Sequence, residues 1–217
     1  MNKFKKNGYL FVKNFISQEL VKVTLDYVEL KLKTTGLVHD SEPQFIPNSL
    51  TLYGDHLTES ILKNSMSKME KLTGHELIPS YSFMRLYKKG DRLPKHRDRL
   101  TSQIAVSLCI GSSYEGEDYD WPFYLDGKEF ICKPGDAVIY NGIESFHWRE
   151  PLERDWHLPI FLFYMDKNAE FADDLIYDAR PELGHPRSSQ KLDVRAYEKK
   201  YFEARGYVDA GRVTYLD

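Results

Sequence analysis

The chain has few cysteines, no long apolar segment and no large excess of charge of either sign. Its two cysteines, Cys109 and Cys132, both lie in apolar stretches that are typical of strands. Cysteines in such stretches behave as small buried hydrophobic residues, so we expect no disulfide and a reducing, cytoplasmic location. No apolar run approaches the roughly 18 residues that indicate a membrane-spanning helix, so we expect no contact with a membrane.

The near balance of charges also excludes a class of partner. The formal net charge is −3 and the isoelectric point is near 6.2, which argues against a dedicated nucleic-acid-binding protein. The length of 217 residues suits one domain, or one domain with an appendage. Aromatic residues make up 14% of the chain, with 15 tyrosines and 12 phenylalanines, and this abundance favours β-structure.

The N-terminal third predicts one strand and two helices. Residues 8–16 are rich in β-branched and aromatic side chains and predict a strand. Ser17 is a good N-cap for an amphipathic helix that Gly36 would end. Residues 57–74 predict a second amphipathic helix. The connection at 37–55 contains two prolines and a glycine, and connections of this length are more often functional than idle.

From residue 76 the pattern changes to short strands separated by turns. The turns are predicted at "KKGD" (88–91), "DG" (Asp126–Gly127) and "KPGD" (133–136). About eight strands are expected. One lies near residue 96, and the others lie at 76–87, 102–111, 121–125, 128–132, 137–142, 144–150 and 157–166. This spacing predicts a mainly β fold with flanking helices: a jelly roll or cupin-like barrel with both N-terminal helices packed outside it.

The last fifty residues differ in character from the rest. After residue 166 the chain is charged and irregular, with one predicted helix at 193–206. This segment lacks a core of its own, so we divide the chain into a barrel domain at 1–166 and a C-terminal extension at 167–217. The extension is expected to pack on the core or on a partner, and it could form a homodimer.

The stretch "RLPKHRDRL" carries the first candidate for chemistry. On a strand, His96 and Asp98 would point to the same side because they are two residues apart. His147 follows 49 residues after Asp98, one strand beyond the turn "KPGD". Two histidines and one carboxylate on a β scaffold form the facial triad of non-haem iron(II), which leaves coordination positions open. The alternative is a salt-bridged surface tripeptide together with a buried core histidine.

The surroundings of the triad resemble a known family. The stretches "GYLFVKNFISQELV", "YSFMRLYKKGDRLPKHRD", "KPGDAVIYNG" and "FLFYMD" resemble the 2-oxoglutarate- and iron(II)-dependent oxygenases, most closely the prolyl-4-hydroxylase-like branch. The resemblance covers residues 8–166 and implies that the predicted barrel is a double-stranded β-helix. It implies Fe(II) held by His96, Asp98 and His147, 2-oxoglutarate chelating the metal, and O2 as co-reactant. It also implies hydroxylation of a C–H bond with release of succinate and CO2.

The chain departs from this family at the residue that holds the far carboxylate of 2-oxoglutarate. The family usually has an arginine or lysine at the start of the last core strand, where this chain has His157. Three residues are candidates for holding this carboxylate. They are His157 itself, as a neutral donor or as imidazolium; Arg149, on the strand of His147; and Arg154, in the following loop. We favour Arg149 and His157 acting together. Tyr87 matches a family tyrosine that hydrogen-bonds the cosubstrate, although a core tyrosine would look the same.

Three further expectations concern the surroundings of this site. Arg149 could instead pair with Glu150 or Glu153 at the rim. Arg85 alternates with Tyr87 and so faces inward if Tyr87 does; it could hold a substrate carboxylate, or form a salt bridge with a scaffold acid. The substrate implied by the family is an amino acid or a peptidyl residue.

Two other classes of protein remain open from the sequence. A cupin-like barrel could bind a metal or a small ligand without oxidising anything. An interaction module could carry the triad as a vestige, which predicts no bound metal.

Overall fold

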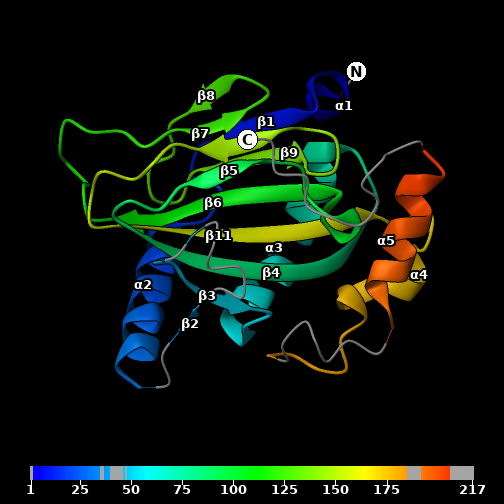
Figure 1. Ribbon diagram of the computed structural model, residues 1–217, viewed down its shortest axis with the longest axis horizontal. Helices are drawn as coiled ribbons and strands as arrows, with labels where there is room; N and C mark the ends of the chain where they lie inside the picture. Colours follow the sequence, from blue (N-terminus) through cyan, green and yellow to red (C-terminus); the bar gives the residue numbers. More distant parts are fainter. Residues whose placement is uncertain (1, 35–36, 40–45, 47, 185–191, 206–217) are drawn as a thin grey trace.

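The structure is a computed structural model that describes residues 2–34, 37–39, 46, 48–184 and 192–205. Within these residues, two antiparallel sheets lie with helices around them (Figure 1). The strands are β1 Tyr9–Val12, β2 Val38–His39, β3 Leu50–Tyr53, β4 Leu77–Lys88, β5 Leu93–His96, β6 Ile104–Ser112, β7 Phe123–Leu125, β8 Lys128–Phe130, β9 Ala137–Asn141, β10 His147–Arg149 and β11 Trp156–Asp166. The helices are α1 Lys3–Asn7, α2 Gln18–Lys33, α3 His56–Thr73, α4 Ala172–Leu175 and α5 Val194–Glu203, with short 3-10 turns η1 Leu100–Ser102 and η2 Ile176–Ala179.

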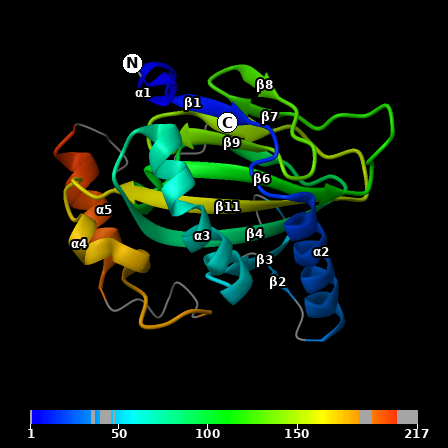
Figure 2. The same cartoon turned by 180° about the vertical axis from the view of Figure 1, so that it is seen from behind.

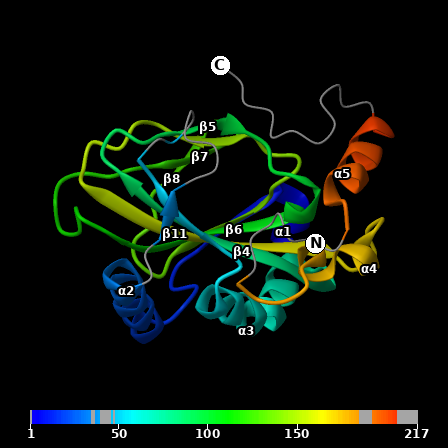
Figure 3. The same ribbon diagram turned by 60° about the horizontal axis from the view of Figure 1, so that its bottom comes forward.

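The two sheets differ in size. In the described part of the chain, the larger sheet has the strand order β1-β9-β6-β11-β4-β3-β2 and the smaller has the order β5-β10-β7-β8. Figure 3 shows three layers, with α2 and α3 on one side of the larger sheet and β5, β7 and β8 on the other. The mainly β architecture with antiparallel sheets and flanking helices that the sequence predicts is therefore confirmed.

The predicted helix signals operate as expected at Ser17 and Gly74, and Asp55 adds a cap that was not predicted. Ser17 caps α2 by accepting a hydrogen bond from the backbone N–H of Leu20 at 3.2 Å. Asp55 caps α3 through the N–H of Leu57 at 3.0 Å. Gly74 ends α3 with φ of 72°, a left-handed conformation that glycine adopts without steric cost. The other predicted stop, Gly36, lies outside the described residues, and α2 ends at Lys33.

Three short elements differ from the sequence expectation. The turn of helix α1 precedes the first strand, and part of the predicted loop at 37–55 forms β2 and β3. β3 joins the larger sheet by pairing with β4, from Leu50 opposite Leu86 to Tyr53 opposite Phe83. A four-residue strand gains its stability from such a neighbour and not from its own sequence, which is why the local pattern did not predict it. Residues 40–45 and 47 of this loop lie outside the described residues.

The larger sheet presents two chemically different faces. Aliphatic side chains on one face, such as Val106 and Leu108 of β6, pack against Val21 of α2 and against Ile61 and Leu62 of α3. Figure 2 shows α2 and α3 lying across this face. The helices therefore cover one side of the sheet and leave the opposite side to meet the smaller sheet.

The opposite face is largely aromatic. Tyr81 of β4, Phe161 and Phe163 of β11 and Tyr140 of β9 cluster there with Phe123 of β7, so this cluster joins the two sheets. Residues of one parity on β11 face the smaller sheet and those of the other parity face the helices, as the period of two in a strand requires. The candidate site residues lie on this inner, aromatic side.

The C-terminal extension packs on the core where the structure describes it. Val194 and Phe202 of α5 and Leu175 of α4 form a buried cluster with Leu100 and Met165 of the core. Figure 1 shows α4 and α5 side by side at one end of the sheets. A homodimer through this extension stays a prediction. Among the described helices, none combines the length and apolar character that crossing a bilayer would require.

Candidate active site

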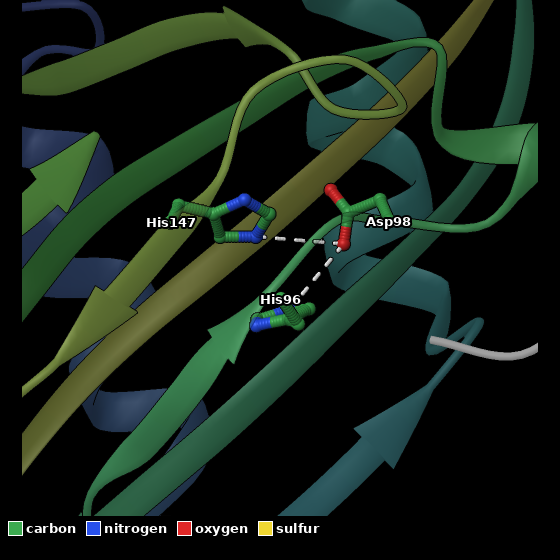
Figure 4. A group of neighbouring side chains, drawn as sticks. All are labelled: His96, Asp98 and His147. Carbon is green, nitrogen blue, oxygen red and sulfur yellow. Dashed lines mark ion pairs between the residues drawn. The ribbon is translucent and has the colours of Figure 1, made fainter. Parts of the chain in front are cut away.

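The three predicted metal ligands converge on the inner side of the smaller sheet. His96 ends β5 and His147 begins β10, and these two residues are register partners. Asp98 Oδ1 lies 3.7 Å from His96 Nε2 and 3.6 Å from His147 Nε2 (Figure 4). One donor atom from each residue lies within 4.8 Å of the others. Since metal–nitrogen bonds are about 2 Å long, these distances allow one ion to contact all three.

Backbone carbonyls select the tautomer of both histidines. His96 Nδ1 lies 2.7 Å from the carbonyl of Pro94, and His147 Nδ1 lies 3.1 Å from the carbonyl of Ser145. A carbonyl oxygen only accepts hydrogen bonds, so each Nδ1 carries the proton and each Nε2 keeps its lone pair. Both Nε2 atoms face Asp98, which is the arrangement in which histidines bind a metal.

The charge state of the triad also suits a cation. Burial and the neighbouring His147 lower the pKa of His96, so its imidazole is neutral near pH 7. The pKa of Asp98 lies well below its usual range although burial alone would raise it, so its carboxylate is ionised near pH 7. A neutral histidine and an ionised aspartate are the forms that coordinate metals.

Asp98 is held differently from the sequence expectation. β5 ends at His96, so Asp98 lies in the irregular segment that leads to η1 and not on a strand. Its backbone N–H donates to the carbonyl of Gly142 at 2.8 Å. A Cβ atom at Gly142 would lie 2.7 Å from Asp98 Oδ2 and 2.2 Å from the carbonyl oxygen of Ser102. The place of the Asp98 carboxylate therefore requires glycine at position 142.

The predicted cosubstrate residues surround one tryptophan. Arg149 is only 3% exposed; its Nη1 donates to the carbonyl of Trp121 at 2.8 Å, and its guanidinium lies 4.6 Å from the centre of the Trp121 ring. His157 and Tyr87 are register partners on β11 and β4. Their rings lie 5.0 and 5.1 Å from that of Trp121.

These three side chains hold polar atoms that hydrogen-bond to none of the described residues. Tyr87 Oη, Arg149 Nε and His157 Nε2 are buried and have no hydrogen-bond partner in the part of the chain that the structure describes. In the same part, no carboxylate lies within 4 Å of Arg149. Buried donors are nearly always satisfied in native proteins, so these atoms mark a place for a bound polar group.

The state of His157 follows from its neighbours. Its Nδ1 lies 2.9 Å from the hydroxyl of Tyr114, and its ring is 2% exposed. Burial, and then the positive charge of Arg149, lower the pKa of His157 well below its ordinary value. His157 is therefore neutral near pH 7, which argues against its acting as an imidazolium anchor; its role toward the cosubstrate stays a prediction.

Arg154 lies too far outside the sheets to serve as the anchor. Its Nε donates to Glu117 at 2.7 Å, and its side chain is 36% exposed. Its guanidinium lies over the ring of Tyr119, 4.3 Å from the centre, in the loop outside the sheets. The rim pairing of Arg149 with Glu150 or Glu153 does not occur either, because Arg149 turns inward to the Trp121 carbonyl. Both of these expectations are therefore wrong.

Arg85 lies on the inner face, as its alternation with Tyr87 predicts. Its guanidinium lies 5.2 Å from the centre of the Phe83 ring and 5.6 Å from that of Tyr87. The side chain is half-buried, so it borders the aromatic cluster between the sheets.

Sequence reasoning missed three residues of this site. Trp121 and Tyr114 bound an acidic loop in the sequence, and no local pattern distinguishes them from packing residues. Tyr140 lies with its hydroxyl 3.4 Å from His147 Nε2 and is buried. Burial and the nearby Asp98 raise the pKa of Tyr140 well above its ordinary value, so it stays protonated. The alternation of β9 could have placed it on the inner face.

No family model matches the chain, and no curated protein does. Solved structures, in contrast, match this chain. A prolyl-4-hydroxylase of Pseudomonas putida has a TM-score of 0.59 at 17% identity, over 75% of this chain and 95% of that one. The viral collagen prolyl hydroxylase vCPH of Paramecium bursaria Chlorella virus-1, solved as a 2OG complex, has a TM-score of 0.55 at 13% identity, over 75% of this chain and 97% of that one. SnoN, a non-heme alpha-ketoglutarate-dependent epimerase of nogalamycin biosynthesis, has a TM-score of 0.64 at 12% identity, over 88% of this chain and 89% of that one.

These likenesses define the fold. The chain has the fold of the 2-oxoglutarate- and iron(II)-dependent oxygenases, and the resemblance to their prolyl-hydroxylase-like branch is confirmed at that level. SnoN has also been solved with Fe3+ and alpha-ketoglutarate, and HygX of Streptomyces hygroscopicus with nickel, 2-oxoglutarate and hygromycin B. The neighbours thus include enzymes that act on quite different molecules.

Proposed function

We propose that the protein is an iron(II)- and 2-oxoglutarate-dependent dioxygenase that hydroxylates a C–H bond of an amino acid or a peptidyl residue. The convergence of His96 Nε2, His147 Nε2 and Asp98 Oδ1 is the observation that carries this proposal. The fold shared with oxygenases agrees with it. Cupins that bind metals share similar barrels, so the proposal depends on the site and not on the fold alone.

His96, Asp98 and His147 would hold Fe(II) and leave its remaining positions to 2-oxoglutarate and oxygen. When bound, iron and 2-oxoglutarate supply an oxidative decarboxylation in which O2 gives one oxygen atom to succinate, formed with CO2, and the other to the substrate C–H bond. The chain itself fixes both Nε2 lone pairs toward the metal and keeps Asp98 ionised. No side chain is required as a general base.

Arg149, His157 and Tyr87 would receive the far carboxylate of 2-oxoglutarate. Their unused donors provide a cation, a neutral N–H and a hydroxyl around Trp121. A buried cation without a neighbouring carboxylate is costly, and an anionic ligand removes that cost. We assign the main charge to Arg149 and a supporting hydrogen bond to His157.

Arg85 would contact an anionic group of the substrate. It borders the aromatic residues between the sheets, and the residue as a whole is half-buried. The carboxylate of an amino acid or an acidic group of a peptide has the chemistry to meet it. We also propose a cytoplasmic location, since both cysteines are free and burial raises the pKa of Cys109 to about 12.

Spectroscopy and turnover together test the proposal. Fe(II) and 2-oxoglutarate, added without oxygen, should give a weak visible charge-transfer band. Oxygen should then release succinate, with stimulation by members of a panel of amino acids and peptides. His75→Ala is a matched control, because it removes a histidine that contacts another carboxylate, Asp166, and should leave the band unchanged.

The competing classes give different results in the same experiment. A barrel that only binds a metal or small ligand takes up iron but gives neither the band nor succinate. A vestigial triad takes up no metal.

A further inference from the structure

Asp178, in the C-terminal extension, is a fully buried carboxylate in contact with the core. Its two oxygens accept hydrogen bonds from Nη1 and Nη2 of Arg99, the first at 2.8 Å. The hydroxyl of Tyr53 donates to the same carboxylate. The extension thus provides a two-point ionic contact from residue 178 to residue 99.

Arg99 is the residue directly after the metal-ligand candidate Asp98. Its Nε donates to the hydroxyl of Tyr81 at 3.3 Å, and its guanidinium lies 4.2 Å from the centre of that ring. Glu198 of α5 adds a second ionic contact at 3.5 Å. These contacts fix the Arg99 side chain on every side, and two of them come from the extension.

Few other contacts orient Asp98. Its backbone N–H is bound to the carbonyl of Gly142, but its Oδ2 is buried and has no hydrogen-bond partner among the described residues. Metal-ligating carboxylates normally have such a partner. The direction of this carboxylate therefore depends on the backbone at residues 98 and 99, which the Arg99 side chain anchors.

The backbone that presents Asp178 is strained. Tyr177, Asp178 and Ala179 have φ of 50°, 56° and 51°, three consecutive non-glycine residues in the left-handed region. Such a conformation persists only where its surroundings impose it. A buried ion pair also contributes little net stability, because desolvation of the charges offsets their attraction. Stability alone therefore does not account for this arrangement, whereas a requirement for geometry does.

We propose that Asp178 is a positioning residue of the metal site, which acts through Arg99 to orient Asp98. The inference rests on the proposed metal site. It makes the C-terminal extension a part of that site, although none of its described residues is a candidate ligand.

The test is the affinity of the full chain for Ni(II), measured by calorimetry without 2-oxoglutarate. Asp178→Asn keeps the shape of the side chain and tolerates the left-handed backbone, but weakens the contact with Arg99. We expect a loss of metal affinity of about tenfold or more, as is typical when groups that orient ligands are changed. The visible spectrum of bound Co(II) should change as well, because the coordination geometry changes.

Glu59→Gln is the matched control. Glu59 forms a buried ion pair at 2.9 Å with Arg180 of the same extension, and it makes no ion pair or hydrogen bond with Arg99 in the described part of the chain. This variant also replaces a buried carboxylate by an amide and lowers stability, but should bind Ni(II) as the parent does. Equal losses of affinity in both variants would overturn the proposal, since they would reflect loosening of the fold.

A neutral pair separates positioning from a simple charge effect. The double variant Asp178→Asn with Arg99→Gln removes one negative and one positive charge. If Asp178 positions Asp98, the affinity stays low in the double variant; a return to the parent value would overturn the proposal. If Asp178→Asn does not fold, Arg99→Lys, which keeps the charge but loses the two-point contact, takes its place in the same comparison. A parent protein that binds no Ni(II) would instead refute the proposed function.

Discussion

Replacement of Arg149 tests the proposed cosubstrate site most directly. The guanidinium uses Nη1 for the Trp121 carbonyl and leaves Nε without a partner among the described residues. The edge formed by Nε and Nη2 can meet a carboxylate with two parallel hydrogen bonds. Arg149→Met removes these donors but keeps an unbranched apolar side chain against the rings of Trp121 and Phe123, which the guanidinium now covers at 4.6 and 5.3 Å.

The expected loss follows from the strength of charge-assisted hydrogen bonds. Each contributes about 1.5–3 kcal/mol, so the loss of even one should lower the affinity for 2-oxoglutarate roughly 10- to 150-fold, and the loss of both should lower it further. His157→Gln loses one neutral hydrogen bond of about 0.5–1.5 kcal/mol and should fall by roughly 2- to 13-fold. Calorimetry on the Ni(II)-loaded protein measures both affinities without turnover.

A truncated ligand shows where Arg149 acts. 2-Oxobutyrate keeps the 2-oxo acid head that chelates the metal but lacks the far carboxylate. It should bind the parent weakly and should bind Arg149→Met equally weakly. If Arg149→Met weakens both acids by the same factor, or weakens 2-oxoglutarate by less than about threefold, Arg149 does not contact the far carboxylate and the assignment fails.

Four other outcomes are expected. His96→Ala and His147→Ala should each abolish iron binding, and Asp98→Ala should weaken it and abolish turnover; parent-like iron content and succinate release in all three variants would refute the triad. The affinity for 2-oxoglutarate should be flat from about pH 6.5 to 8.5, because His157 has a lowered pKa and is neutral throughout; an affinity that falls as pH rises would restore the imidazolium anchor. The pKa of His157 is depressed in the folded chain, so below about pH 6.5 the unfolded chain binds more protons than the folded chain does. The free energy of unfolding, measured by urea denaturation, should therefore decrease as pH falls through this range, and less steeply in His157→Gln. Gly142→Ala should lower Ni(II) affinity and the melting temperature together, because its Cβ would meet Asp98 Oδ2 and a backbone carbonyl; unchanged affinity would show that Asp98 is free to move.

The sequence predicted the elements whose signals are local. These are the turns at residues 88–91 and 133–136, the Asp126–Gly127 hairpin, the cap at Ser17 and the helix end at Gly74. Each depends on a few adjacent residues and bounds a strand or helix of the structure. His96 and His147 were predicted because two such strands bring them into register. Asp98 was predicted with the wrong backbone, since the end of β5 depends on Gly142 from another part of the chain.

The rest of the site depends on contacts distant in sequence. Trp121 touches Tyr87, Arg149 and His157 from a loop whose sequence looks merely acidic and aromatic. The contact of Asp178 with Arg99 spans 79 residues and starts in an irregular part of the extension, outside its predicted helix at 193–206. Neither could be predicted from local propensity, because nothing near these residues in the sequence indicates which strand ends they approach.

His157 and Arg149 are best understood as a matched pair. Both are buried against the same tryptophan, and the charge of Arg149 already lowers the pKa of His157. A lysine or arginine at position 157, as the resembling family has, would place a second buried cation beside the first, and two like charges in a site of low dielectric repel strongly. A neutral donor on β11 avoids that repulsion and still offers a hydrogen bond. If Arg149 holds the far carboxylate as proposed, the departure at residue 157 is the expected companion of an arginine on β10, because one cation is enough for one carboxylate.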